Sequence, residues 1–377
     1  MPDTSHSVTR VPVLRPELPA TDALLPYLRS LDDSRIYSNN GPMVLRLEQR
    51  LSAFFDQPKC GVTAAASGTA ALIGAILTKA GRGVPGRATA LVASYTFVAS
   101  ATAAQNCGYA PHFVDLSPDH WGLDPVTLRN HPRLHEAGLV IVTAPYGRLV
   151  DLTAWEAFED ATGVPVVVDC AAGFDVMARA EDMRLSRRIP VAVSFHATKT
   201  FGCGEGGAVF SADPDFALRC HRAINNGFLG CRQVIGDNTN GKMSEYHACV
   251  GMAELDGWAH KAARYATMTT MYRAAFADRG LCAPVHIGGT VSAAYALCLC
   301  PDAATAESLR LALAYGGFET RFWYGHGLHA EAGFGPYPHD PMPHTDALSR
   351  RLLGLPAYLG LEADDMHQIA ATVARVI

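Results

Sequence analysis

The chain has 377 residues, of which 49% are hydrophobic and 18% are charged, and its net charge is −5. A chain of this size can bury a large core and favours two domains. The basic residues are scattered, so we expect neither nucleic acid nor a membrane surface as a partner. The sequence has no apolar run of the roughly 18 residues that a membrane helix needs, and its first 15 residues lack a signal-peptide pattern. We therefore expect a cytoplasmic protein.

The ten cysteines are dispersed along the chain. No two of them form a Cys-x-x-Cys pair, and none joins histidines at a zinc spacing. We expect free, mostly buried thiols in a reducing compartment and no metal site.

Between about residues 60 and 211, short apolar runs alternate with longer segments of helical period. This alternation predicts a parallel sheet covered by helices on both faces. The predicted strands are Thr89–Ala93, His112–Val114, Leu139–Thr143, Pro165–Val168, Val191–Phe195 and Ala208–Ser211. Amphipathic helices are predicted on either side, with apolar positions Val44, Leu47, Leu51 and Phe54 before the sheet and Met243, Tyr246, Val250 and Leu255 after it.

The pattern changes beyond about residue 261. Tyr295–Cys300 predicts a strand and Ala303–Ala314 a helix, and a stretch rich in Gly, Pro and His from 325 to 344 precedes a final helical pattern. We expect a large domain over residues 1–260, which includes an N-terminal arm, and a small C-terminal domain over residues 261–377.

Two residues follow predicted core strands at the edge where α/β folds bind ligands. Lys199 lies in a glycine-rich loop after one strand, and Asp169 ends the run Val166-Val167-Val168. A lone lysine is more often a solvated surface charge, and such an aspartate can simply cap a helix. The pair nevertheless suits pyridoxal 5′-phosphate (PLP), which needs a lysine to form a Schiff base and a carboxylate to keep its ring nitrogen protonated.

Small residues open an apolar helix at Ser67-Gly68-Thr69. Backbone N–H groups at a helix start, with nearby hydroxyls, suit a phosphate, although the same pattern more often marks an ordinary cap. The Ser194 hydroxyl, five residues before Lys199, can reach the same phosphate. Phe97 follows another strand, so its ring is either a core residue or a wall that stacks on the cofactor.

These segments together resemble the DegT/DnrJ/StrS family of PLP-dependent nucleotide-sugar aminotransferases. The matching motifs, in chain order, are Ser38 to Pro42, Ser67-Gly68-Thr69, Thr96-Phe97, Phe113-Val114-Asp115, Tyr146-Gly147, Asp169-Cys170-Ala171, Ser194 to Gly207 and Asn240 to Glu245. The resemblance implies an α/β aspartate-aminotransferase-like fold (PLP fold type I). Its large domain has a mixed, mostly parallel sheet, and its C-terminal domain is a smaller α/β unit.

The resemblance also implies the roles of the site residues, which are Lys199 for the Schiff base, Asp169 for the pyridinium, Phe97 for stacking, and Gly68, Thr69 and Ser194 for the phosphate. Asn240 would reach the cofactor phosphate of a neighbouring subunit, which implies a homodimer with shared active sites. Ala172 replaces a frequent Gln or His, and Lys242 replaces a frequent Arg that makes a planar two-pronged contact. Both departures bear on substrate choice.

The resemblance implies transfer of an amino group, with glutamate as donor, to a nucleotide-linked keto sugar, specifically a 4-keto-6-deoxyhexose. Substrates with a 3-keto sugar or a keto-cyclitol stay open. Weaker candidates for substrate contact are Arg321, Tyr324 and His329.

Two other functions stay open. One is a PLP-dependent sugar dehydratase, although such relatives carry histidine where Lys199 stands. The other is a binding or regulatory protein of the same fold. A nicotinamide enzyme does not fit, because no Gly-x-Gly-x-x-Gly opens a helix after the first strand.

Overall fold

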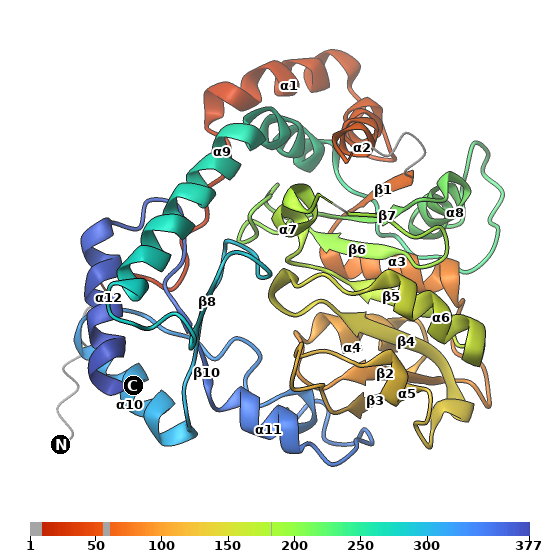
Figure 1. Ribbon diagram of the computed structural model, residues 1–377. Coiled ribbons are helices and arrows are strands. Elements are labelled where there is room, and N and C mark those ends of the chain that lie inside the picture. The colour runs from red at the N-terminus through yellow and green to blue at the C-terminus, as the bar shows by residue number, and fades with distance from the viewer. Residues whose placement is uncertain (1–9, 56–60, 182) are drawn as a thin grey trace, which may run out of the picture.

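The computed structural model describes residues 10–55, 61–181 and 183–377. A seven-stranded sheet in the order β1-β7-β6-β5-β4-β2-β3 forms the centre of the larger part (Figure 1). Its strands are β1 (Gly61–Ala65), β2 (Thr89–Ala93), β3 (Ala110–Val114), β4 (Ala137–Thr143), β5 (Val166–Asp169), β6 (Val191–Ser194) and β7 (Gly207–Ser211). β2 to β6 pair in parallel, whereas β7 runs antiparallel to β6 and β1. The expected mixed, mostly parallel sheet is confirmed, and β1 is an additional strand.

Helices cover both faces of this sheet. The helices of the larger part are α1 (Thr21–Ser34), α2 (Pro42–Phe54), α3 (Gly68–Lys79), α4 (Ala99–Asn106), α5 (Pro125–Leu128), α6 (Leu152–Thr162), α7 (Phe174–Arg179) and α8 (Pro214–Ile224). Leu139 and Ile141 of β4 belong to the core that α3, α4 and α8 cover on one face, while Val140 and Val142 belong to the core that α2, α6 and α7 cover on the other. Because both faces are covered, the strands read as continuous apolar runs.

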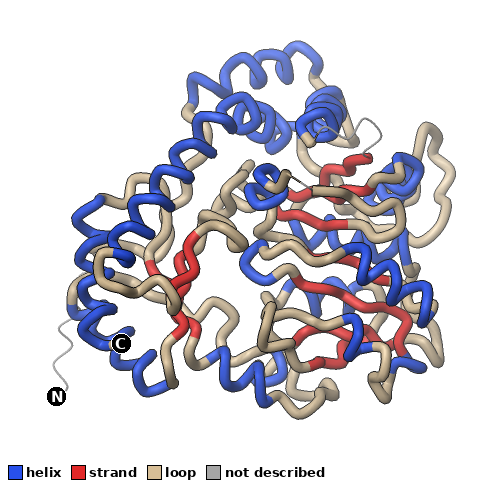
Figure 2. Tube along the Cα trace, viewed as in Figure 1, coloured by secondary structure: helices blue, strands red, loops and turns tan. Residues whose placement is uncertain are grey.

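A second, three-stranded antiparallel sheet forms the small domain. It contains β8 (Val285–Ile287), β9 (Ala296–Leu299) and β10 (Leu352–Leu355), in the order β10-β9-β8. Helices α10 (Ala303–Tyr315), α11 (Pro343–Ser349) and α12 (Ala363–Val376) accompany it (Figure 2). Val11, near the start of the described chain, also packs in this core and pairs with Phe318.

The long helix α9 (Glu245–Ala277) belongs to both cores. Leu255 and Trp258 pack in the core of the larger part, and Met268 and Tyr272 pack in the core of the small domain. The helix passes Lys261 as one continuous element. No break in α9 marks the expected domain boundary between residues 260 and 261. The position of this boundary therefore stays a prediction.

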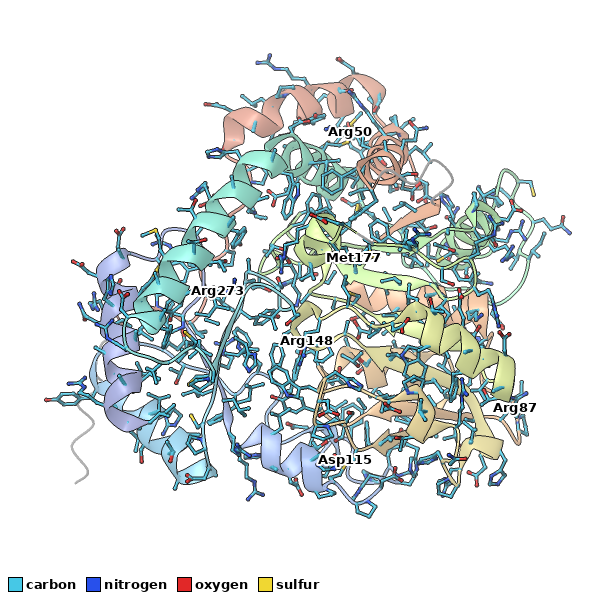
Figure 3. All side chains as sticks on the ribbon, viewed as in Figure 1. Arg50, Arg87, Asp115, Arg148, Met177 and Arg273 are labelled. Carbon is cyan, nitrogen blue, oxygen red and sulfur yellow. The ribbon has the colours of Figure 1, made fainter. Side chains whose placement is uncertain are left out.

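The chain between β9 and β10 also extends the edge of the large sheet. Phe113 of β3 donates its N–H to the carbonyl of Pro338 and accepts a hydrogen bond from the N–H of Asp340. Asp115, which Figure 3 shows beside α11, accepts hydrogen bonds from the N–H and hydroxyl of Thr345. These contacts fix the Gly/Pro/His-rich stretch against the larger part of the molecule.

Two histidines hold the same stretch through one carboxylate. The Nε2 atoms of His112 and His131 lie 2.8 and 3.0 Å from the two oxygens of Asp340. The Nδ1 atom of His131 also accepts a hydrogen bond from the N–H of Arg133. The three side chains form a hydrogen-bonded His-Asp-His tie, and the expected absence of a metal site stays a prediction.

Of the helices in the described ranges, none combines the length and apolarity needed to span a bilayer. The cysteines within these ranges are free thiols, and most are buried. Cys60 lies outside the described residues.

Candidate functional site

The carboxyl ends of β5 and β6 form the centre of the candidate site. Asp169 is the last residue of β5, and its backbone pairs with Thr143 of β4 and Ala192 of β6. β6 ends at Ser194, and the following loop carries Lys199. The two residues singled out from the sequence therefore lie at one edge of the sheet, as strand-end positions require.

The carboxylate of Asp169 is buried and held in place by two hydrogen bonds. The hydroxyl of Ser100 donates to Oδ2 at 2.6 Å, and the N–H of Ala171 donates to Oδ1 at 3.2 Å. Burial raises the pKa of Asp169, whereas these two donors and the positive charge of Lys199 act in the opposite direction. A cationic group facing this carboxylate would stabilise its charged form further.

The loop that carries Lys199 is closed by backbone hydrogen bonds. The N–H of Ala197 donates to the carbonyl of Gly204 at 2.8 Å, and the N–H of Lys199 donates to His196 at 2.9 Å. The Lys199 side chain is partly buried, and its Nζ lies 3.4 Å from the hydroxyl of Tyr295. The lysine is thus held on a short, well-tied loop beside a phenol from the small domain.

The start of α3 faces the same region. The Ser67 hydroxyl caps the helix by accepting from the N–H of Ala70, which leaves the N–H groups of Gly68 and Thr69 ahead of the first intrahelical bond. A Cβ atom on Gly68 would lie only 2.7 Å from the Cβ of Ser194, so glycine permits this close approach. Unused N–H groups, a helix start and the Ser194 hydroxyl together make a site suited to a phosphate.

Phe97 and Asn240 are exposed within the single chain. Phe97 is 61% exposed, although its neighbour Thr96 is buried. The Oδ1 of Asn240 accepts a hydrogen bond from the Nζ of Lys242 at 2.6 Å, and Lys242 pairs with Ala65 at the end of β1. Among the described residues, no hydrogen bond or ion pair joins Asn240 to Lys199, and the role of Asn240 stays a prediction.

A tyrosine cluster lies beside the lysine, formed by Tyr95, Tyr146, Tyr295 and Tyr324. The rings of Tyr146 and Tyr324 stack with centroids 4.8 Å apart, and the hydroxyls of Tyr95 and Tyr146 lie 2.8 Å apart. Burial raises the pKa of Tyr146 and Tyr324 well above the usual value, so both are neutral phenols at physiological pH. Sequence reasoning singled out Tyr324 but missed Tyr95 and Tyr295, because aromatic residues near strands usually indicate core.

The other two substrate candidates have partners inside the chain. The guanidinium of Arg321 bonds Glu319 at 2.8 Å and lies over the ring of Trp323. His329 has its Nδ1 2.7 Å from the hydroxyl of Ser94, directly after β2, and burial lowers its pKa. His329 thus lies close to the carboxyl end of β2. Contact of Arg321 or His329 with a substrate stays a prediction.

The chain is similar in sequence and fold to several known proteins. Protein Rv3402c of Mycobacterium tuberculosis H37Rv is 28% identical over 377 residues, which cover 97% of this chain and 90% of that protein. A dTDP-4-amino-4,6-dideoxy-D-glucose transaminase of Shigella dysenteriae is 30% identical over 246 residues, 65% of this chain and 64% of its own length. The crystal structure of DesI with its TDP-sugar product superposes with a TM-score of 0.83 at 28% identity and covers 98% of this chain and 93% of that one.

The site residues also fit the cofactor. A buried carboxylate faces the same edge as a partly buried lysine, and a helix start with unused N–H groups packs on Ser194. The model of the DegT/DnrJ/EryC1/StrS aminotransferase family matches residues 20–374, nearly the whole chain. This protein therefore belongs to the DegT/DnrJ/EryC1/StrS aminotransferase family and is a PLP-dependent aminotransferase.

Proposed function

We propose that this aminotransferase transfers the amino group of glutamate to a nucleotide-linked keto sugar, a 4-keto-6-deoxyhexose. The observation that carries the proposal is the placement of Lys199, Asp169 and the start of α3 at one edge of the sheet. The choice of sugar is supported by the Shigella dysenteriae relative, whose name describes a dTDP sugar with an amino group at C4.

Each group of the site has a distinct task in this proposal. When bound, PLP supplies an electron sink for the bonds broken at the carbon that carries the amino group. Asp169, whose carboxylate is oriented by two hydrogen bonds, would keep the ring nitrogen protonated. The N–H groups of Gly68 and Thr69 and the hydroxyl of Ser194 would hold the phosphate, and Phe97 would provide a stacking surface for the ring.

Lys199 is the proposed attachment point of PLP and the proposed base of the reaction. Its Nζ takes a proton from one carbon and returns it to another, which requires the amine to stay in one place between the two steps. The Tyr295 hydroxyl accepts a hydrogen bond from Nζ and restricts its position. The buried ring of Tyr146 packs against the ring of Tyr295 and shields that side of the phenol from water.

We also propose that two copies of the chain share their active sites. Support comes from apolar side chains that one chain leaves exposed near the site, including Phe97 at 61% and Val98 at 40%. Tyr37 and Tyr246 stack on each other with centroids 5.9 Å apart and are also about half exposed. Burial of such a patch is a common reason for association of two identical chains.

The test is an absorption spectrum of the purified protein with added PLP, for wild type and Lys199→Ala. We expect a band near the visible edge in wild type, its loss when glutamate is added, and no such band in Lys199→Ala. Lys79→Arg is the matched control, because it keeps the cation that pairs with Glu159 and lies away from the site. A band that persists in Lys199→Ala, or that glutamate leaves unchanged, contradicts the proposal.

The acceptor is tested on the glutamate-treated protein. A dTDP-linked 4-keto-6-deoxyhexose should restore the band, and mass spectrometry should show the amino sugar. Restoration by a 3-keto sugar or a keto-cyclitol, with no response to the 4-keto sugar, would reassign the substrate while leaving the aminotransferase reaction in place.

A further inference from the structure

Asp175 of α7 is a buried carboxylate with a complete set of hydrogen-bond donors. It is 6% exposed, and its Oδ1 accepts hydrogen bonds from the hydroxyls of Thr200 at 3.1 Å and Ser292 at 2.7 Å. Its Oδ2 accepts from the N–H of Ala293 at 2.9 Å and forms an ion pair with Arg179. A charged group stays buried when donors surround it in this way.

These donors come from two separate parts of the molecule. Thr200 directly follows Lys199 in the large-domain loop, whereas Ser292 and Ala293 lie between β8 and β9 of the small domain. Figure 1 shows this small-domain segment reaching α7, and Figure 3 labels Met177 on the same helix. One carboxylate therefore binds the lysine loop and the small domain at the same time.

Arg179 strengthens the connection to the small domain. Besides its ion pair with Asp175, it donates hydrogen bonds to the carbonyls of Gly289 at 2.8 Å and Val291 at 2.7 Å. The segment 289–293 is thus held through its backbone as well as through the Ser292 hydroxyl. Two residues of one short helix fix the course of this segment.

The fixed segment leads directly to the phenol beside the lysine. The N–H of Tyr295 donates to the carbonyl of Ser292 at 3.0 Å, which closes a tight turn between the held residues and Tyr295. The Tyr295 hydroxyl in turn lies 3.4 Å from the Nζ of Lys199. A continuous path of hydrogen bonds therefore runs from Asp175 through Ser292 to Tyr295 and, on the other side, from Asp175 through Thr200 to the lysine loop.

We propose that Asp175, assisted by Arg179, is a positioning residue that sets the distance between Tyr295 and Lys199. The inference rests on the proposed role of Lys199 as the base. A base that moves a proton between two carbons loses efficiency when it is displaced by a fraction of a bond length. Asp175 acts through Tyr295 and Thr200, and it does not itself touch substrate or cofactor.

The variants Asp175→Asn, Ser292→Ala and Tyr295→Phe separate the steps of this path. Asp175→Asn should lower kcat by about 10²-fold while changing KM for glutamate by less than about threefold. Ser292→Ala removes one of the two hydroxyl donors and should lower kcat by about fivefold. Tyr295→Phe should shift the pH profile of kcat in the same direction as Asp175→Asn.

Asp213→Asn, which alters surface ion pairs with Arg187 and Arg219, is the control and should behave as wild type.

Amide hydrogen exchange of the protein without cofactor provides a readout independent of the reaction. Residues 288–295 should exchange about tenfold faster in Asp175→Asn and faster in Ser292→Ala, but at the wild-type rate in Tyr295→Phe, whose backbone contacts are intact. Unchanged exchange in Asp175→Asn overturns the proposal. Faster exchange with a wild-type kcat and pH profile also overturns it, because Asp175 would then only join the domains.

Failure of the proposed function gives a different result. In that case wild type shows no lysine-dependent band with PLP and no conversion by glutamate, and the catalytic part of this inference falls with it. The exchange measurements would still show whether Asp175 holds the small-domain segment.

Discussion

The two sides of the site are built in different ways. On one side, Asp169, Lys199 and the start of α3 follow strands of the large sheet, and each is held by neighbours on that sheet or its loops. On the other side, Tyr295 and Tyr324 arrive from the small domain and depend on how that domain docks. In the proposed account, the residues on the large sheet hold the cofactor, and the small domain positions Tyr295 beside Lys199.

The largest effect is expected from a substitution of Asp169, the carboxylate on the large sheet. Asp169→Asn keeps an oxygen that accepts from Ser100 but cannot hold a proton on the ring nitrogen. We expect kcat with glutamate to fall by about 10²- to 10⁴-fold, the range for loss of a positioned acid–base or electrostatic group. Steady-state kinetics with saturating PLP measures this effect, and a loss of less than about threefold would contradict the assigned role.

Although Asp169→Asn should lower kcat, we expect it to increase the stability of the cofactor-free protein. Burial raises the pKa of Asp169 above its ordinary value of 3.8, so its contribution to folding is present below that pH and is lost as pH rises through the folded-state pKa. Burial of this carboxyl group therefore lowers stability at pH 7 relative to low pH, and Asp169→Asn should raise the Tm of the cofactor-free protein at pH 7. A lower Tm at pH 7 would show that the carboxylate is retained for the fold.

A smaller effect tests whether the cofactor site on the large sheet needs a residue of a second subunit. Asn240→Ala should weaken PLP binding by about 10- to 100-fold, the effect of losing a hydrogen bond to a charged group. At a PLP concentration too low to load the Asn240→Ala protein, mixed dimers of Asn240→Ala and Lys199→Ala should recover about a quarter of wild-type activity, because half of the dimers are mixed and each has one intact site. Activity that stays at the level of the separate variants would place Asn240 in its own subunit's site.

The smallest effect is expected on the small-domain side. The Tyr324 hydroxyl accepts only a long hydrogen bond, 3.4 Å, from the N–H of Tyr146, whereas its ring stacks on the Tyr146 ring. Tyr324→Phe should change kcat by less than about threefold, since it keeps the stacked ring, and Tyr324→Ala should cost more. If the Phe and Ala variants are equally impaired, the hydroxyl itself contacts substrate.

The difference between the two sides also explains what the sequence could predict. The positions of Asp169 and Lys199 at strand ends could be inferred from short stretches of sequence. Asp169 ends the apolar run that begins at Val166, and Lys199 lies in the glycine-rich loop that follows the apolar run of β6. The roles of Asp175 and Tyr295 could not be inferred in this way, because they depend on contacts between segments far apart in sequence, 117 residues for Asp175 with Ser292 and 96 for Tyr295 with Lys199. β1 was missed for a similar reason: its five residues, rich in small side chains, form a strand by pairing with distant β7.

Chemical trapping of the cofactor identifies the lysine that binds it. The wild-type protein is incubated with PLP, treated with sodium borohydride to fix the cofactor on its lysine, digested and mapped by mass spectrometry. The sequence contains five lysines, Lys59, Lys79, Lys199, Lys242 and Lys261. We predict modification of the peptide that carries Lys199, and its loss when glutamate is added before the borohydride. Modification of a different lysine, or of none, would contradict the account.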